Sequence, residues 1–284
     1  MANEAGSVNM VAGRACKGLP RAGGRGRALA IMRKGHRPSG APSGGRTRLW
    51  GRHAVTAALA NPERSLRKLW GTHEAIAALG LAPSILAVQY AEAADLGRMV
   101  PSDAPHQGLV LETDPLPDKW LDELFELAVD PADCRPIIVL DQVTDPHNVG
   151  AVLRSAVAFD ALGIVTQDRH SPPESGALAR AASGALEVLP WIRVVNLSRA
   201  LDEMADAGYW RVGLTGHTDV LLQDAMQPGK IALVLGAEGE GMRQNTQAHC
   251  DVLAKLPISP KIESLNISNA AAVALYAAAT RAVV

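Results

Sequence analysis

Two polar residues whose types and spacing suit chemistry, Asn148 and Arg154, stand in the stretch DPHNVGAVLRSA (residues 145–156). Pro146 stiffens the approach, and the pattern predicts a helix that starts at Val149 with Asn148 as its N-cap. At 100° per residue, Arg154 shares a helix face with Asn148 and points back toward the loop. A guanidinium so placed suits a phosphate or a developing negative charge. Taken alone, however, the spacing N-x-G-x-x-x-R favours a solvated helix charge.

A second loop, LVLGAEGEGM (residues 233–242), follows an apolar strand and contains three glycines in six residues. Such glycines allow tight turns and a close approach of the backbone to a ligand. Their spacing, G-x-x-G-x-G, reverses that of the dinucleotide-binding motif, and Glu238 and Glu240 would repel a pyrophosphate. The loop therefore favours a cationic or hydrogen-bonding ligand over a nicotinamide or phosphate group.

A third loop lies in KLPISPKIESLNISNAAAVALYAAA (residues 255–279), just before the last helical segment. Two prolines exclude regular structure between residues 257 and 263. Ser264 and Asn266 follow, and Asn266 or Ser268 is the predicted N-cap of an Ala-rich helix, so either residue also has a purely structural interpretation. The small residues of that helix predict very close packing against its neighbours.

The three loops belong to a regular series of strands and helices in the second half of the chain. Apolar runs predict strands at residues 136–140, 163–166, 187–191, 210–214, 231–235 and 251–256. Helical patterns occur at residues 149–160, 176–183, 198–207, 244–249 and 266–283. Continuous apolar strands that alternate with helices predict a mostly parallel sheet covered on both faces. Ligands of such sheets bind at the carboxyl ends of the strands.

The first half of the chain divides into three parts of different character. Residues 1–47 show no sustained periodicity and predict a disordered arm. Residues 48–114 predict a small α/β domain, with helices at 53–60 and 72–79 and strands at 66–70, 85–91 and 108–113. Residues 115–135 are interpreted as a linker because they start within the turn-rich sequence DPLPD.

Composition excludes several classes of protein. No window approaches eighteen apolar residues without a charge or a helix breaker, so we expect no transmembrane helix and no membrane partner. The three cysteines, Cys16, Cys134 and Cys250, lack CxxC spacing. This pattern argues against a zinc site or a disulfide framework and favours a reducing compartment. We therefore expect a cytoplasmic protein without a metal.

The net charge of −1 hides a strong asymmetry. Residues 1–48 contain eight Arg and two Lys against the single acid Glu4, and the remaining residues contain 18 basic and 28 acidic side chains. A basic arm on an acidic body suggests a polyanion such as RNA as the partner. A solvated tail, a transit peptide, or a true start at Met32 are the alternative interpretations of the arm.

Taken together, the three loops resemble motifs one, two and three of the SpoU (TrmH-type) branch of the SPOUT RNA methyltransferases. The resemblance covers the chain from Ile137 to its C-terminus. The upstream sequences WGRHAVTAAL and HQGLVLE resemble the small N-terminal domain of the rRNA guanosine 2′-O-methyltransferases. The resemblance implies an α/β fold, with a knotted methyltransferase domain over residues 136–284 and a small RNA-binding domain over residues 48–114.

The resemblance also implies S-adenosylmethionine as the cofactor, bound in the knot, and a homodimer. Matched to the family's motifs, the cofactor contacts fall, mainly through backbone groups, on Leu235, Gly236, Leu256, Ile258 and Leu265. The sequence SPKIESLN departs from a commoner Gly/Ser-rich version of this loop. We therefore expect a stiffer loop here.

The implied reaction is methylation of a ribose 2′-hydroxyl, with a guanosine of 23S rRNA as the expected target and tRNA as the alternative. In the family, the arginine that matches Arg154 takes the hydroxyl proton. A guanidinium has a pKa above about 12, so a clamp on phosphate and alkoxide is an equal interpretation. Asn148, Glu238, Ser264 and Asn266 would orient Arg154 or the nucleotide. A non-catalytic RNA-binding or ribosome-assembly protein is the rival from another class, and an oxidoreductase is disfavoured because G-x-G-x-x-G is missing.

Overall fold

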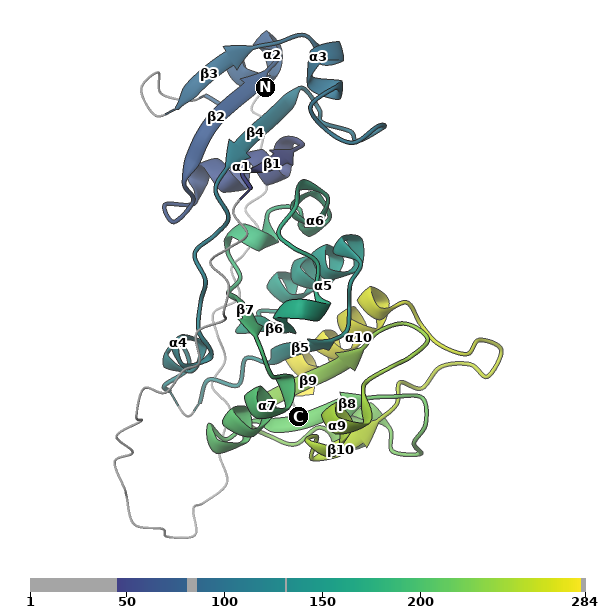
Figure 1. Ribbon diagram of the computed structural model, residues 1–284. Coiled ribbons are helices and arrows are strands. Elements are labelled where there is room, and N and C mark those ends of the chain that lie inside the picture. The colour runs from purple at the N-terminus through teal and green to yellow at the C-terminus, as the bar shows by residue number, and fades with distance from the viewer. Residues whose placement is uncertain (1–44, 81–85, 131, 282–284) are drawn as a thin grey trace, which may run out of the picture.

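The computed structural model describes residues 45–80, 86–130 and 132–281, so the predictions for the basic arm lie almost wholly outside the described residues. Two sheets, one above the other in Figure 1, are formed by the two halves of the chain. The upper sheet belongs to the small N-terminal domain, and the lower one to the larger C-terminal domain.

The N-terminal sheet has four strands in the order β1-β4-β2-β3, in which β2 and β3 are parallel and the other pairs antiparallel. Its strands are β1 (Thr47–Trp50), β2 (Leu66–Gly71), β3 (Ala87–Tyr90) and β4 (Leu109–Thr113). Its helices are α1 (Arg52–Ala60), α2 (His73–Ala77) and α3 (Ala93–Gly97). The predicted alternation of strands and helices is confirmed, although the sequence patterns missed β1 and α3.

The C-terminal sheet has six strands in the order β10-β8-β9-β5-β6-β7, and all of its pairs are parallel. Its strands are β5 (Ile137–Asp141), β6 (Gly163–Gln167), β7 (Trp191–Val194), β8 (Trp210–Leu214), β9 (Ile231–Gly236) and β10 (Val252–Ala254). Its main helices are α5 (Pro146–Ala158), α6 (Gly176–Ala182), α7 (Leu197–Asp206), α9 (Gln244–Ala248) and α10 (Ile267–Thr280). The predicted parallel sheet is confirmed, whereas the knot stays a prediction.

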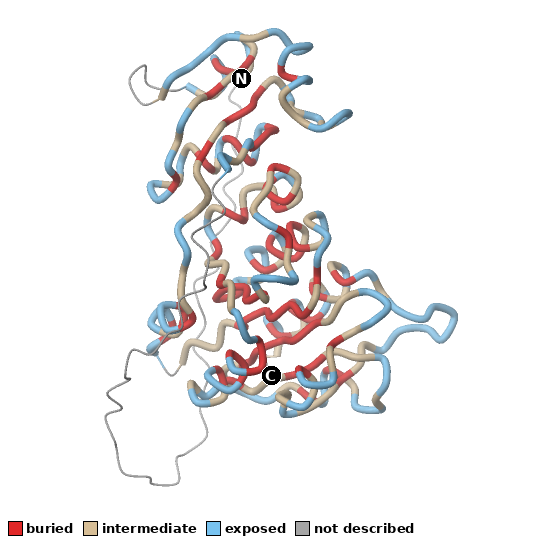
Figure 2. The backbone as a smooth tube through the Cα atoms, in the orientation of Figure 1, coloured by how far each residue is buried: buried red, intermediate tan, exposed pale blue. Residues whose placement is uncertain are grey.

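Helices cover both faces of this sheet, which explains why its central strands, β5 and β9, are apolar except at their last residues. All five residues of β5 are buried, and alternate residues point to opposite faces. Ile138 and Leu140 pack in the layer of α5 and α10, whereas Ile137 and Val139 pack in the layer of α7. Figure 2 shows the result as a continuous buried band along the strands, with exposed loops at their ends.

Two predicted boundaries were wrong. The helix expected from Val149, with Asn148 as its N-cap, begins three residues earlier, at Pro146. The carboxylate of Asp145 accepts hydrogen bonds from the backbone N–H groups of His147 (3.1 Å) and Asn148 (3.3 Å). Asp145 is therefore the N-cap, and a proline at the first helical position costs no intrahelical hydrogen bond.

The strand predicted at residues 187–191 was also wrong. A 3-10 turn, η2 (Ala185–Glu187), occupies the start of this segment, and β7 begins only at Trp191. Gly184 adopts a φ of 95°, which turns the chain, and Val188 is 68% exposed. Pro190 has no backbone N–H and stands directly before the first residue of β7. The segment interpreted as a linker contains a further helix, α4 (Leu121–Glu126).

A buried ion-pair network joins the two domains. Arg64, from the N-terminal domain, is 4% exposed and donates hydrogen bonds to the carboxylates of Glu174 and Glu187 of the C-terminal domain. Burial by itself lowers the pKa of Arg64, but hydrogen bonding and attraction from these carboxylates outweigh it and raise the pKa. Next to this network, a Cβ at Gly176 would lie 1.9 Å from the Trp50 ring, so the two domains touch directly.

Candidate active site

The three loops singled out in the sequence follow the carboxyl ends of β5, β9 and β10, at one edge of the parallel sheet. Asp141 and Gly236, the last residues of β5 and β9, are paired in the sheet. The loop after β5 leads into α5, the loop after β9 contains Glu238, and the loop after β10 leads into α10. This edge is where parallel sheets bind their ligands.

One carboxylate oxygen holds the three loops together. Glu238 Oε1 accepts hydrogen bonds from Asn266 Nδ2 (2.6 Å), Asn148 Nδ2 (3.2 Å) and the backbone N–H of Ile267 (3.2 Å). Asn266 Nδ2 also donates to Asn148 Oδ1 at 3.0 Å. Asn148, Glu238 and Asn266, which come from three separate motifs, thus form one hydrogen-bonded cluster.

Asn266 has two structural tasks in this cluster. Its Oδ1 accepts a hydrogen bond from the backbone N–H of Ser268 (2.9 Å), so Asn266 is the N-cap of α10, one of the two predicted candidates. The amide of the same side chain faces the second loop through Glu238. The start of α10 and the conformation of the glycine-rich loop are therefore coupled.

Arg154 and Ser264 lie outside the cluster. Both residues are exposed, and neither side chain makes a hydrogen bond or an ion pair with the part of the chain that the structure describes. The two residues before Arg154, Val152 and Leu153, are fully buried, so the helix packs through them and leaves the arginine on its outer side. The guanidinium is available to a group that is not part of this chain.

The five positions expected to contact the cofactor lie around the ends of β9 and β10. Leu235 is 2% exposed, Leu256 and Leu265 are half-buried, and Ile258 is 36% exposed. A Cβ at Gly236 would lie 2.0 Å from the carbonyl carbon of Gly241, so only glycine lets this loop fold back on itself. These five positions offer main-chain groups and apolar side chains, and none of them is a lysine that could bind phosphate. They therefore fit an uncharged adenosine moiety.

A second polar group at the same sheet edge was missed in the sequence. Asp141 is fully buried at the end of β5 and forms an ion pair with Arg243 (2.6 Å), whose backbone N–H also donates to it at 3.0 Å. Arg243 further donates to Gln167 Oε1, at the end of β6, at 2.6 Å. In the sequence, an acid at the end of an apolar strand could have pointed to Asp141. Nothing in the sequence pointed to its partner Arg243, which is 102 residues away.

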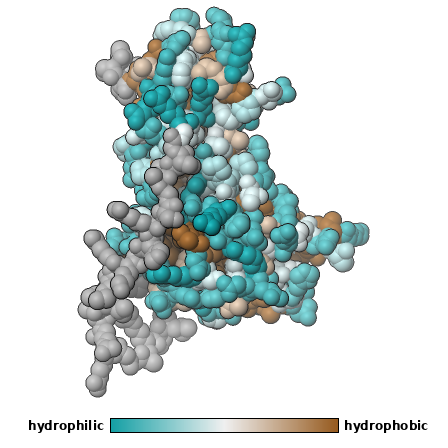
Figure 3. Space-filling view, in the orientation of Figure 1, coloured by the Kyte–Doolittle hydropathy of each residue, from teal (hydrophilic) through white to brown (hydrophobic). Residues whose placement is uncertain are grey.

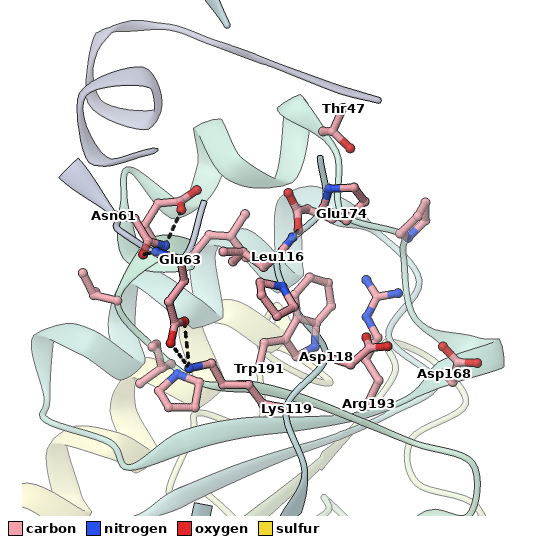
Figure 4. Close-up of a pocket in the computed structure, with 18 of the residues that line it drawn as sticks. Thr47, Asn61, Glu63, Leu116, Asp118, Lys119, Asp168, Glu174, Trp191 and Arg193 are labelled. Carbon is pink, nitrogen blue, oxygen red and sulfur yellow. Dashed lines mark hydrogen bonds and ion pairs between the residues drawn. The ribbon is translucent and has the colours of Figure 1, made fainter. Parts of the chain in front are cut away.

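A cleft lies elsewhere, between the two domains (Figure 4). It has a volume of about 350 Å³, and its walls include Glu63, Lys119, Glu174, Trp191 and Arg193. The Arg193 guanidinium lies 4.3 Å from the centre of the Trp191 ring, and burial lowers the pKa of Arg193. None of the three loops contributes to this cleft.

The described residues contain neither a metal-binding cluster nor a membrane-spanning helix. In residues 45–80, 86–130 and 132–281, no group of three or more His, Cys, Asp or Glu side chains is arranged to hold a metal ion. Over the same residues, no helix has the length and apolar character needed to cross a membrane.

Comparison with known proteins agrees with this arrangement of domains and loops. Residues 135–276 match the SpoU rRNA Methylase family, and residues 48–119 match the RNA 2'-O ribose methyltransferase substrate binding domain. The parallel sheet, the converging loops and the two family matches together define an RNA ribose methyltransferase fold with an appended substrate-binding domain. The chain belongs to the SpoU rRNA methylase family.

Several relatives are named 23S rRNA (guanosine-2'-O-)-methyltransferase RlmB. The chain is 34% identical over 238 residues to the protein of Pseudomonas syringae pv. tomato, covering 81% of this chain and 94% of that protein. It is 38% identical over 241 residues to that of Ralstonia nicotianae, with coverages of 81% and 94%. An uncharacterized tRNA/rRNA methyltransferase of Synechocystis is 36% identical over 234 residues, but the chain spans only 61% of its length.

Solved structures share the fold over most of the chain. The SpoU methyltransferase AviRb of Streptomyces viridochromogenes, solved in complex with the cofactor AdoMet, matches with a TM-score of 0.70 and 24% identity over 84% of this chain and 91% of that one. A TrmH-family protein described as an RNA methyltransferase, from Porphyromonas gingivalis, matches with a TM-score of 0.66 and 25% identity over 82% and 88% of the two chains.

Proposed function

We propose that this protein transfers a methyl group from S-adenosylmethionine to the 2′-hydroxyl of a guanosine in 23S rRNA. The observation that carries the proposal is the cluster of Asn148, Glu238 and Asn266, which draws the three motif loops to one edge of the sheet. The target nucleotide is proposed from the relatives that carry the RlmB name and match this chain over both domains.

The cofactor is proposed to bind where the loops after β9 and β10 meet. Leu235, Gly236, Leu256, Ile258 and Leu265 would hold it through main-chain groups and apolar contacts. When bound, S-adenosylmethionine supplies an electrophilic methyl group on a positively charged sulfonium. A loop that carries two exposed carboxylates, Glu238 and Glu240, suits a cation, whereas it would repel a phosphate.

Arg154 is proposed to grip the RNA at the reacting ribose. A guanidinium stays protonated at neutral pH, so stabilising the alkoxide as it forms and holding the adjacent phosphate suits it better than removing a proton. Because Arg154 has no partner in the described part of its own chain, its donors are available for this task. Ser264, exposed in the loop before α10, is proposed to help orient the nucleotide.

We further propose that the active enzyme is a homodimer whose interface includes α5 and α10. These helices expose Val157 (39%), Val273 (46%) and Tyr276 (58%), and the rings of Phe159 and Tyr276 pack edge to face with centroids 6.0 Å apart. Arg154 precedes Val157 by three residues and therefore shares its helix face. Association through this face brings Arg154 to the subunit boundary.

The proposal is tested by incubating the protein with labelled S-adenosylmethionine and separate pools of unmodified 23S rRNA and tRNA. A 2′-O-methyl group blocks alkaline cleavage of the linkage that follows it, so resistant linkages locate the modified nucleotide. We expect one resistant linkage after a guanosine in the rRNA. Label in tRNA alone would show that tRNA, and not rRNA, is the substrate. Label in neither pool, with RNA binding retained, would favour a non-catalytic RNA-binding protein.

A further inference from the structure

One face of the N-terminal sheet carries an aromatic ring between two cations. Side chains alternate between the faces of a strand, and the pairing of Trp70 with Gln89 and of Arg48 with Glu112 places these four residues on the same face. Lys68 lies two residues before Trp70 in β2 and belongs to this face as well. The opposite face, which includes Leu69, packs in the main core with α1.

The indole of Trp70 is fixed by a hydrogen bond and lies close to both cations. Its Nε1 donates a hydrogen bond to Gln89 Oε1 at 3.1 Å. Lys68 Nζ lies 4.9 Å and Arg48 Cζ 5.9 Å from the ring centroid. Trp70 is half-buried, because it also packs against the small core of Trp50, Leu96 and Val110, whereas Arg48 and Gln89 are exposed.

These two cations differ from their neighbours because neither forms an ion pair with a carboxylate in the part of the chain that the structure describes. Arg48 donates only to the backbone oxygen of Met99, at 3.2 Å. By contrast, Arg46 pairs with Glu112, which lies between Arg48 and Lys68 in the sheet, and Arg67 pairs with Asp114. The face therefore retains two uncompensated positive charges beside an anchored aromatic ring.

We propose that Trp70, Arg48 and Lys68 form a platform that binds an unpaired nucleotide of the RNA substrate. Bases stack on aromatic side chains, and a neighbouring guanidinium or ammonium binds the phosphates on either side. Both cations sit at the ends of flexible side chains, so they move from the ring face to the phosphates when a base arrives. This inference rests on the proposed function, because the bound RNA is the methylated one.

The platform is rigidly connected to the methyltransferase domain. Trp50 lies on the same face of the sheet, and its ring packs against Gly176 at the domain junction. Arg64, fully enclosed by Glu174 and Glu187, fixes the same junction. A nucleotide stacked on Trp70 is thereby held at a set distance from the cluster around Glu238, so the platform selects the RNA whose reactive ribose reaches the active site.

The platform is tested in the full-length protein with three variants: Trp70→Ala, Trp70→Phe and the double replacement Arg48→Gln with Lys68→Gln. Arg98→Gln is the control, because Arg98 is exposed in the same domain but pairs with Asp95. We expect KM for an unmodified 23S rRNA fragment to rise about 5- to 150-fold in Trp70→Ala, the range measured for loss of one base stack, while kcat is retained. The double variant should flatten the salt dependence of binding by about 0.7 per lost contact.

Trp70→Phe controls for a folding defect, because phenylalanine retains the apolar contacts of the tryptophan with the core. It offers a smaller surface for stacking. Binding of a uridine-rich single-stranded oligonucleotide should quench the tryptophan emission of the wild type, and Trp70→Phe should abolish most of that quenching. Unchanged affinity in Trp70→Ala, or equal quenching in Trp70→Phe, overturns the platform. So does an affinity loss confined to the double variant, because charge alone would then explain binding.

Failure of the platform is separable from failure of the proposed function. A wild type that methylates the rRNA fragment, together with Trp70→Ala at the same KM, overturns the platform and leaves the enzyme intact. A wild type that transfers no methyl group overturns the proposed function. Even then, the oligonucleotide affinity of the variants decides whether Trp70 stacks on RNA.

Discussion

Asn266 and Glu238 are 28 positions apart in the chain, and a 2.6 Å hydrogen bond joins Asn266 Nδ2 to Glu238 Oε1. The same carboxylate oxygen reaches Asn148 in the first motif and the backbone of Ile267 in the third. Glu238, in the second loop, thus bonds to the first and third loops through one atom. Its removal should disturb every part of the active site at once.

We therefore expect Glu238→Ala to lower kcat/KM by tenfold or more, since the lost hydrogen bonds hold together the loops that are proposed to bind the methyl donor and the nucleotide. The free energy of unfolding should fall by only about 1 kcal/mol, because the cluster is largely exposed. Glu240→Ala is the matched control, as Glu240 is an exposed acid in the same loop. Equal activity of the two variants, measured with labelled cofactor, would contradict a special role for Glu238.

The parallel sheet was predictable because its strands are mostly apolar and helical patterns separate them. The cluster was partly predictable, since Asn148, Glu238 and Asn266 each follow or precede such an element. The pair of Asp141 and Arg243 was not, because a buried ion pair across 102 residues has no local pattern. Contacts between domains were hidden for the same reason.

Local chemistry also explains the wrong boundaries. Asn148 and Asp145 are both good N-caps, and the choice between them depends on Pro146, which fits only at the start of the helix. The run of residues 187–191 is mostly apolar, but Pro190 stands directly before Trp191, so the part before the proline turns instead of pairing. The platform around Trp70 was missed because the register of β2 against β3 decides which residues share a face.

Replacing Tyr276 with Asp should convert the proposed dimer into a monomer and abolish methyl transfer. The tyrosine is 58% exposed on α10 and packs edge to face with Phe159, so a carboxylate there would be desolvated at the interface. Sedimentation velocity at micromolar concentration measures the change. Val129→Asp is the control, because Val129 is exposed but lies outside these helices. A Tyr276→Asp protein that stays dimeric would place the interface elsewhere.

Deletion of residues 1–44 tests whether the basic N-terminal sequence contributes to RNA binding. Each lysine or arginine contact with phosphate gives a slope of about −0.7 in the logarithm of affinity against the logarithm of salt concentration on single strands. We expect the truncated protein to bind RNA more weakly and with a flatter slope. An identical slope would show that this segment is dispensable, as expected for a start at Met32.

Arg64→Met should reduce the free energy of unfolding by about 3–5 kcal/mol, since it leaves the buried carboxylates of Glu174 and Glu187 without their cation. Combining it with Glu174→Gln and Glu187→Gln should restore most of the stability, because no unpaired charge then remains. Arg46→Met provides the surface control, as Arg46 is 64% exposed in its ion pair with Glu112 and should change stability by less than about 1 kcal/mol. Urea unfolding measures all three, and equal effects of Arg64→Met and Arg46→Met would contradict a stabilising role of the buried ion-pair network.

Arg154→Ala separates binding of the cofactor from chemistry on the RNA. The proposed cofactor contacts follow β9 and β10 and do not include α5, so calorimetry should give an unchanged affinity for S-adenosylmethionine. The exposed helix position tolerates alanine, so the protein should remain folded. Methyl transfer should fall by about two to three orders of magnitude, as for the loss of one preorganised group that stabilises charge. Arg154→Lys should recover little of it, because an ammonium cannot bind phosphate and alkoxide with a planar fork. Near-normal turnover by Arg154→Ala would make Arg154 a solvated helix charge and assign the reaction to the cluster around Glu238.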